Sequence, residues 1–205
     1  MGWGLLGCAR VQLRRGRPER ALAALQEAAP TVSDRLGGVE LHGLLALACL
    51  RGGDPAAAVQ SARAGLQTLL EARPVSFTTL TGTAGVVESL MALSAKAGGR
   101  DRALADDARL ALKLLRRFAR IFPLGEPHYQ WLQGREWLAA GRSARALKCW
   151  QRAADAAARL QMPYDEALAW QAIAQHATGS AATVAHARAA ALYETLGLPE
   201  APPLP

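Results

Sequence analysis

The sequence predicts an all-α protein, built as an α-solenoid of about five antiparallel helix pairs. Three observations lead to this prediction. Apolar residues recur at helical spacing through most of the chain, and they make up 51% of its 205 residues. Glycines interrupt this pattern at positions 16, 53, 98 and 141, and so divide the chain into segments of similar length. Each segment can hold two helices, and a helix pair needs neighbouring pairs to bury its outer face.

The clearest pair spans about residues 126–161. Its first helix is predicted to end at Gly141, because glycine adopts the left-handed conformation at little cost. Ser143 is expected to cap the second helix. Two small and two large residues recur on the facing sides, and we expect small to face small and large to face large. These residues are Gly134, Ala146, Trp137 and Trp150.

Four looser pairs are expected, at about residues 2–30, 39–73, 76–123 and 163–196. In the second pair, Asp54 is a cap and Pro55 takes the first helical position. In the third, the segment Thr81–Gly85 is glycine-rich but lacks the lysine of a phosphate-binding loop, so we attribute it to tight helix packing. The pairs make one domain over residues 1–197, followed by a disordered proline-rich tail at residues 198–205.

The pair at residues 126–161 resembles the tetratricopeptide repeat (TPR). That family has a small residue within the first helix, a glycine at the turn, and alanine, aromatic and alanine residues along the second helix. Here these are Gly134, Gly141, Ala146, Trp150 and Ala153. The resemblance implies a right-handed solenoid whose first helices line a concave groove, although the intervals of 37, 45 and 43 residues between turn glycines exceed the TPR period of about 34. Residues 134–197 also look like TPR-like C-terminal regions of bacterial multidomain ATPase, cyclase and kinase signalling proteins.

Aligning the pairs on their turn glycines predicts which residues face this groove. The groove would be part apolar and part basic, and would suit an acidic, amphipathic peptide or helix. The same arginines could instead only solvate an exposed surface, and a GC-rich genome would also explain the arginine content of a chain with net charge +7. The predicted groove residues are Arg10, Arg14, Leu47, Arg51, Glu88, Lys96, Trp131 and Arg135.

A second basic surface is predicted on the helix that precedes residue 123. Four basic residues recur there at i, i+3, i+4 and i+7, opposite an apolar stripe. They could contact an acidic partner or nucleic acid, or form only the solvated side of an amphipathic helix. Nucleic acid is the less favoured partner, because the nearby Phe118 and Phe122 fall on the apolar side, away from any bases. These residues, the basic stripe, are Lys113, Arg116, Arg117 and Arg120.

No catalytic, metal-binding or cofactor-binding residue is predicted. None of the four histidines pairs with a second histidine or a cysteine at a metal-ligand spacing. His42 lies two helical turns before Cys49, but neither an orienting group nor an oxyanion site accompanies them. The three cysteines lie far apart, which favours a reducing compartment and simple packing.

The sequence therefore predicts a non-catalytic scaffold for protein–protein interaction, in the cytoplasm, since it contains no membrane span or signal peptide. The alternative is the regulatory C-terminal segment of a larger signalling enzyme, such as a nucleotide cyclase, a kinase or an ATPase-linked transcriptional regulator. Solenoid ends normally carry a polar cap, but the first helix is expected to expose Trp3, Leu5 and Leu6. The partner would be an acidic, amphipathic protein segment or an upstream domain of the same parent protein.

Overall fold

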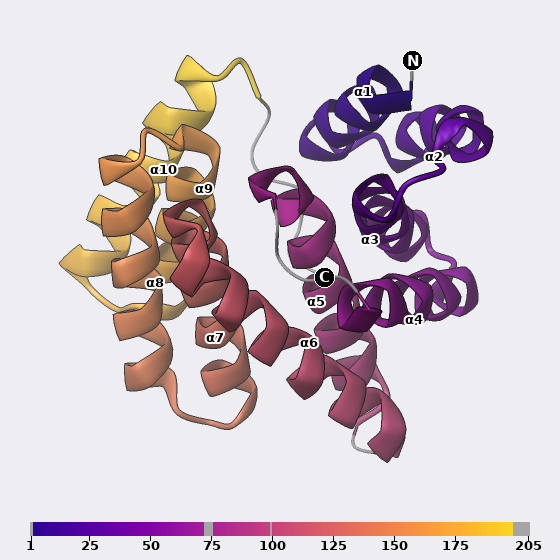
Figure 1. Cartoon of the computed structure of the whole chain (residues 1–205). Helices are drawn as coiled ribbons and strands as arrows, with labels where there is room; N and C mark the ends of the chain where they lie inside the picture. Colours follow the sequence, from indigo (N-terminus) through magenta and orange to yellow (C-terminus); the bar gives the residue numbers. More distant parts are fainter. Residues whose placement is uncertain (1, 72–75, 99, 199–205) are drawn as a thin grey trace. The chain divides into compact units, whose positions relative to one another are not determined.

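The computed structural model describes residues 2–71, 76–98 and 100–198, and these residues form helices and turns without any strand. The all-α prediction is confirmed. Contacts divide the chain into two compact units, unit 1 (Met1–Ile121) and unit 2 (Phe122–Leu204). Figure 1 shows the helices of each unit in chain order, from indigo to magenta in unit 1 and from red to yellow in unit 2. No described helix offers the unbroken apolar length that a bilayer crossing requires.

Unit 1 consists of three consecutive helix pairs. Side chains that precede a helix satisfy the free amides of its first turn. The Asp34 carboxylate accepts from the Gly37 amide at 2.8 Å, so the second pair begins before the expected residue 39. Asp54 accepts from Ala57 at 3.0 Å, which confirms the predicted cap. The helices are α1 (Gly2–Arg14), α2 (Pro18–Ala28), α3 (Arg35–Arg51), α4 (Pro55–Glu71), α5 (Leu80–Lys96) and α6 (Arg102–Ile121), with short 3-10 turns η1 (Ala29–Thr31) and η2 (Phe77–Thr79).

The first helix pair is held by an apolar cluster shared with α3. Leu6 on α1 packs with Leu25 on α2 and Leu44 on α3, and all three are buried. The expectation that Leu6 is exposed is therefore wrong. Helical periodicity places Leu6 on the side of α1 that faces the cluster and Trp3 on the side that faces solvent. Trp3 is 49% exposed.

Helices α3 and α5 touch through their backbones, at a contact that we call the glycine seam (Gly43, Gly82 and Gly85). A Cβ atom added to Gly43 would lie 2.0 Å from the Gly82 carbonyl oxygen, and one added to Gly82 would lie 2.4 Å from the Val39 carbonyl oxygen. A Cβ on Gly85 would lie 2.6 Å from the Gly43 carbonyl oxygen. Only glycine permits such an approach, which confirms that the segment Thr81–Gly85 serves tight helix packing.

Unit 2 consists of two helix pairs and has the predicted turn at Gly141. This residue has φ +71°, and the Arg142 amide donates to the Trp137 carbonyl at 2.8 Å, which closes the end of the first helix. The prediction that Ser143 caps the next helix is wrong, because Arg142 occupies the cap position and Ser143 is already helical. The elements are η3 (Pro123–Gly125), α7 (Glu126–Ala139), α8 (Ser143–Arg159), α9 (Pro163–His176) and α10 (Ser180–Thr195).

The core of unit 2 is arranged around Trp150 on α8. A Cβ atom on Gly134 would lie 2.3 Å from Trp150 Nε1, so the small residue makes room for the large one, contrary to the expected pairing of like sizes. The indole N–H donates to the Trp131 carbonyl oxygen at 3.0 Å, and the ring stacks on His176 at 5.1 Å. Trp137 is only half-buried, with the guanidinium groups of Arg142 and Arg145 over its ring.

Two alanine substitutions at helical glycines should have opposite effects. Gly134→Ala should lower the free energy of unfolding by about 1–3 kcal/mol, because the buried Trp150 ring cannot yield to the new methyl group. Gly7→Ala on α1, where a Cβ meets no atom within 4 Å, should raise it by about 1 kcal/mol through helix propensity. Urea unfolding followed by circular dichroism measures both. Equal effects of the two substitutions would contradict the assigned contact of Gly134 with Trp150.

Candidate functional site

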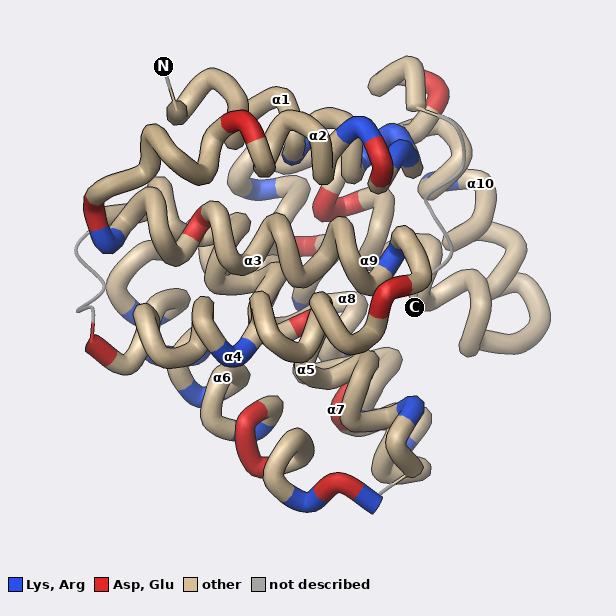
Figure 2. Tube along the Cα trace, turned by 90° about the vertical axis from the view of Figure 1, so that its right-hand side faces the viewer, with Lys and Arg blue, Asp and Glu red and all other residues tan. Residues whose placement is uncertain are grey.

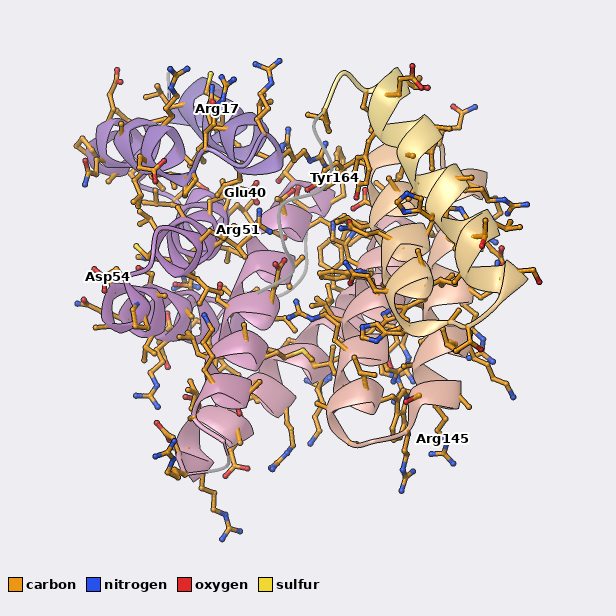
Figure 3. All side chains as sticks on the ribbon, turned by 180° about the vertical axis from the view of Figure 1, so that it is seen from behind. Arg17, Glu40, Arg51, Asp54, Arg145 and Tyr164 are labelled. Carbon is orange, nitrogen blue, oxygen red and sulfur yellow. The ribbon has the colours of Figure 1, made fainter. Side chains whose placement is uncertain are left out.

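The first helices of the three pairs in unit 1 lie next to one another, because α3 packs on both α1 and α5. Polar side chains of these helices meet on one surface, which we call the first-helix face. Figure 3 shows Glu40 and Arg51 on the same side of α3. The side chains of this face that make contacts between helices are Arg10, Glu40, Arg51, Thr81 and Glu88.

Glu40 on α3 serves as a cap for α5. Its carboxylate Oε2 accepts from the Gly82 amide at 2.7 Å, in the first turn of α5, where unpaired amides and the helix dipole favour a negative charge. Glu40 is only 3% exposed. Burial raises the pKa of its carboxyl from 4.5 to about 7, although the Gly82 hydrogen bond and the positive charge of Arg10 both act to lower it.

Arg51, at the end of α3, joins all three helices. Its Nη1 donates to the Leu13 carbonyl oxygen of α1 at 3.2 Å, and its Nη2 lies 3.1 Å from Glu88 Oε1 of α5. Both charged side chains are largely buried, so removing one would deprive the other of the opposite charge of this pair. Arg51 therefore stabilises the packing of the first helices, and its charge is balanced by Glu88.

The structure separates the predicted groove residues by environment. Leu47 and Glu88 are buried, and Arg51 is mostly buried. Arg10 and Lys96 are exposed, and Arg14 is half-buried. Arg10 reaches from α1 towards α5, where its Nη1 lies 3.5 Å from Thr81 Oγ1. The exposed basic group with a contact on this face is therefore Arg10 of α1, whereas Lys96 lies in the last turn of α5.

Two further predicted groove residues, Trp131 and Arg135, belong to unit 2 and contact each other. The guanidinium of Arg135 lies over the ring of Trp131, 5.2 Å from its centroid, one helical turn along α7. Arg135 is half-buried and Trp131 is buried. Their contact is a packing contact along one helix.

A polar contact between α7 and α9 was not foreseen from the sequence. His128 Nε2 lies 3.2 Å from Asp165 Oδ1, and both side chains are largely buried. The signal was present in the alignment of the pairs, since His128 precedes Gly141 by nearly as many residues as Asp165 precedes Gly179. Equivalent positions of consecutive pairs come together in a stack of repeats.

The basic stripe lies on α6, and its four residues are all exposed. Acidic residues of α6 occupy the other half of the helix, where Asp107 pairs with Arg63 of α4 and Asp106 with Arg109. Two members of the stripe, Arg117 and Arg120, also line a cavity of about 530 Å³ between α3, α4 and α6. The C-terminal half of α6 therefore combines positive charge with an apolar opening.

The whole net charge of the chain lies in unit 1. Residues 1–121 contain 17 of the 24 lysines and arginines and 10 of the 17 acidic residues, whereas residues 122–205 contain seven of each. Figure 2 shows how these positions are distributed along the helices. Unit 1 thus carries the full net charge of +7 and would attract an acidic partner over several ångströms.

The described titratable groups with shifted pKa values are buried or half-buried side chains. The described residues contain no group of three or more histidine, cysteine or acidic side chains that could hold a metal ion. Burial raises the pKa of the Cys49 and Cys149 thiols, which makes the reactive thiolate form less accessible. Burial also lowers the pKa of His42. Glu40, the most perturbed carboxyl, is engaged by the amide of α5.

Comparison of the chain with models of protein families, with curated proteins and with solved structures finds no match.

Stability should decrease with rising pH because of Glu40. A carboxyl with a higher pKa in the folded state binds more protons when folded, so its contribution is complete below pH 4.5 and is lost as the pH rises through about 7. Glu40→Gln should keep the hydrogen bond to Gly82 and remove this loss. The free energy of unfolding of the variant, minus that of the wild type, should therefore increase by roughly 3 kcal/mol from pH 4 to pH 8.

Urea unfolding across this pH range measures the difference in free energy of unfolding between the variant and the wild type. The pH dependence that His42 contributes has the opposite sign to that of Glu40, but it is present in both proteins and cancels in the difference. Glu27→Gln, at an exposed position of α2, is the matched control and should leave the pH profile unchanged. A Glu40→Gln profile parallel to that of the wild type would contradict the elevated pKa.

Proposed function

We propose that this chain is a non-catalytic helical-repeat scaffold whose unit 1 binds an acidic segment of another protein or of its own parent protein. The observation that carries the proposal is the charge distribution: unit 1 holds the full net charge of +7, and unit 2 is balanced. Electrostatic complementarity determines both the rate of encounter and the choice of partner. An acidic segment is therefore the partner chemistry that this surface favours.

We further propose that the pairs form a TPR-like, right-handed solenoid. Two contacts support this arrangement. In unit 1 the first helices α1, α3 and α5 are neighbours, and in unit 2 the first helices α7 and α9 are linked by His128 and Asp165. First helices that follow one another in this way line a continuous surface, which is where repeat proteins bind extended partners.

The proposed binding surface is the first-helix face of unit 1, with Arg10 and Lys96 as its exposed cations. Arg51 is excluded from direct binding because Glu88 and the Leu13 carbonyl already engage it. Its role is to fix α1 and α5 relative to α3, so that the exposed cations keep their positions. Recognition would then depend mainly on charge, since Leu47, the apolar member of the predicted groove in this unit, is buried.

Neutralising the exposed cations should weaken binding without unfolding the protein. The probe is a fluorescein-labelled peptide of alternating glutamate and leucine, titrated at low salt and followed by fluorescence anisotropy. Arg10→Gln combined with Lys96→Gln should raise the Kd about tenfold, because two charge contacts are lost. Raising the salt concentration should remove most of the difference between the variant and the wild type.

Lys148→Gln combined with Arg152→Gln is the matched control. It removes the same charge from exposed positions of α8 in unit 2, and the Kd should stay unchanged. An equal loss of affinity in both variants would show non-specific attraction and would contradict a site on the first-helix face. Absence of binding to the wild type at low salt would overturn the proposed partner chemistry. Circular dichroism at pH 6 confirms folding of each variant.

A further inference from the structure

The cavity between α3, α4 and α6 extends from the core of unit 1 to its surface. Its volume of about 530 Å³ lies within the range of small-molecule sites. Val39 on α3 and Phe118 on α6 are buried at its walls. Leu70 on α4 and Ile121 on α6 also line it but are 50% and 54% exposed. The walls are therefore apolar from the buried part to the mouth.

The hydroxyl groups within the cavity already donate their hydrogen bonds to the protein backbone. Thr79, at the end of η2, and Thr83, in the first turns of α5, are the two hydroxyl-bearing residues of the described lining. The Thr79 hydroxyl already donates to the Ser76 carbonyl at 3.1 Å, and the Thr83 hydroxyl donates to the Thr79 carbonyl at 2.8 Å. Because both hydroxyl hydrogens are engaged, the buried part of the cavity favours a hydrocarbon chain over a polar group.

The two charged residues in the described lining of the cavity are both positive. Arg117 and Arg120 line it from α6, both are exposed, and the described lining includes no acidic residue. The acidic residues of α6 lie in its N-terminal half, where Asp106 and Asp107 pair with other arginines. An anionic group at the mouth would thus meet two guanidinium groups, which suit a carboxylate in both charge and geometry.

We propose that this cavity binds a single-chain anionic amphiphile of the fatty-acid class, with its alkyl chain among the leucines of α3 and α4 and its carboxylate on Arg117 and Arg120. The site is separate from the first-helix face, so it does not depend on the proposed scaffold function. Each additional methylene of the chain should lower the Kd about three- to fourfold until the cavity is filled.

The test uses the full chain and isothermal titration calorimetry with octanoate, decanoate and laurate, each below its micelle concentration. Saturable binding that tightens with chain length is expected. Arg117→Gln combined with Arg120→Gln should raise the Kd for laurate at least tenfold and leave the Kd for uncharged dodecanol unchanged. Lys113→Gln combined with Arg116→Gln, on the same helix but outside the cavity, is the matched control and should retain laurate affinity.

A second variant tests the chain-binding part independently. Leu70 lines the mouth of the cavity and is half-exposed, so a larger side chain fits there without overpacking the core. Leu70→Trp should fill the mouth and raise the Kd for both laurate and dodecanol. The proposal is overturned if laurate shows no saturable binding up to about 1 mM. It is also overturned if both pairs of charge variants lose affinity equally, or if the protein binds phosphatidylglycerol vesicles but not monomeric laurate.

Discussion

The backbone contact between α3 and α5 is the constraint on which unit 1 depends. Three glycines allow the two helices to approach until carbonyl oxygens occupy the places of missing Cβ atoms. This distance brings the Glu40 carboxylate within reach of the α5 amides and Arg51 within reach of Glu88. The α4 helix follows the same rule, since a Cβ on its Gly65 would lie 2.5 Å from Val86 Cγ2. A close, buried contact also strengthens the electrostatic interactions that cross it.

Two kinds of arginine coexist on this framework. Arg51 is fixed between helices and balanced by Glu88, whereas Arg10, Arg117 and Arg120 remain exposed. The distinction separates charge that stabilises the fold from charge that is open to a partner. It also separates the two proposed sites, because one uses Arg10 on the first-helix face and the other uses Arg117 and Arg120 in the C-terminal half of α6. A count of arginines alone would have treated them all as one basic surface.

Local chemistry was predictable from the sequence, and contacts between pairs were not. The left-handed glycines, the Asp54 cap and the packing role of Thr81–Gly85 follow from the properties of individual residues. Ser143 does not cap α8 because the helix begins one residue earlier than expected, with Arg142 at the cap position. Gly134 faces Trp150 because the rotation of each helix about its axis determines which residues meet. The roles of Glu40 and of the pair His128–Asp165 depend on the register between neighbouring helices. A periodic pattern does not specify that register.

The tryptophans divide between the units as unevenly as the charge does. Four of the five, at positions 131, 137, 150 and 170, belong to unit 2, where Trp150 is buried and hydrogen-bonded. Unit 1 holds only Trp3, which is half exposed. Intrinsic fluorescence therefore reports almost entirely on the environment of unit 2, while far-ultraviolet circular dichroism reports on the helices of both. The tryptophans of unit 2 thus serve as an intrinsic spectroscopic probe of that unit. The difference in midpoint between the unfolding curves followed by fluorescence and by circular dichroism measures how strongly the unfolding of the two units is coupled.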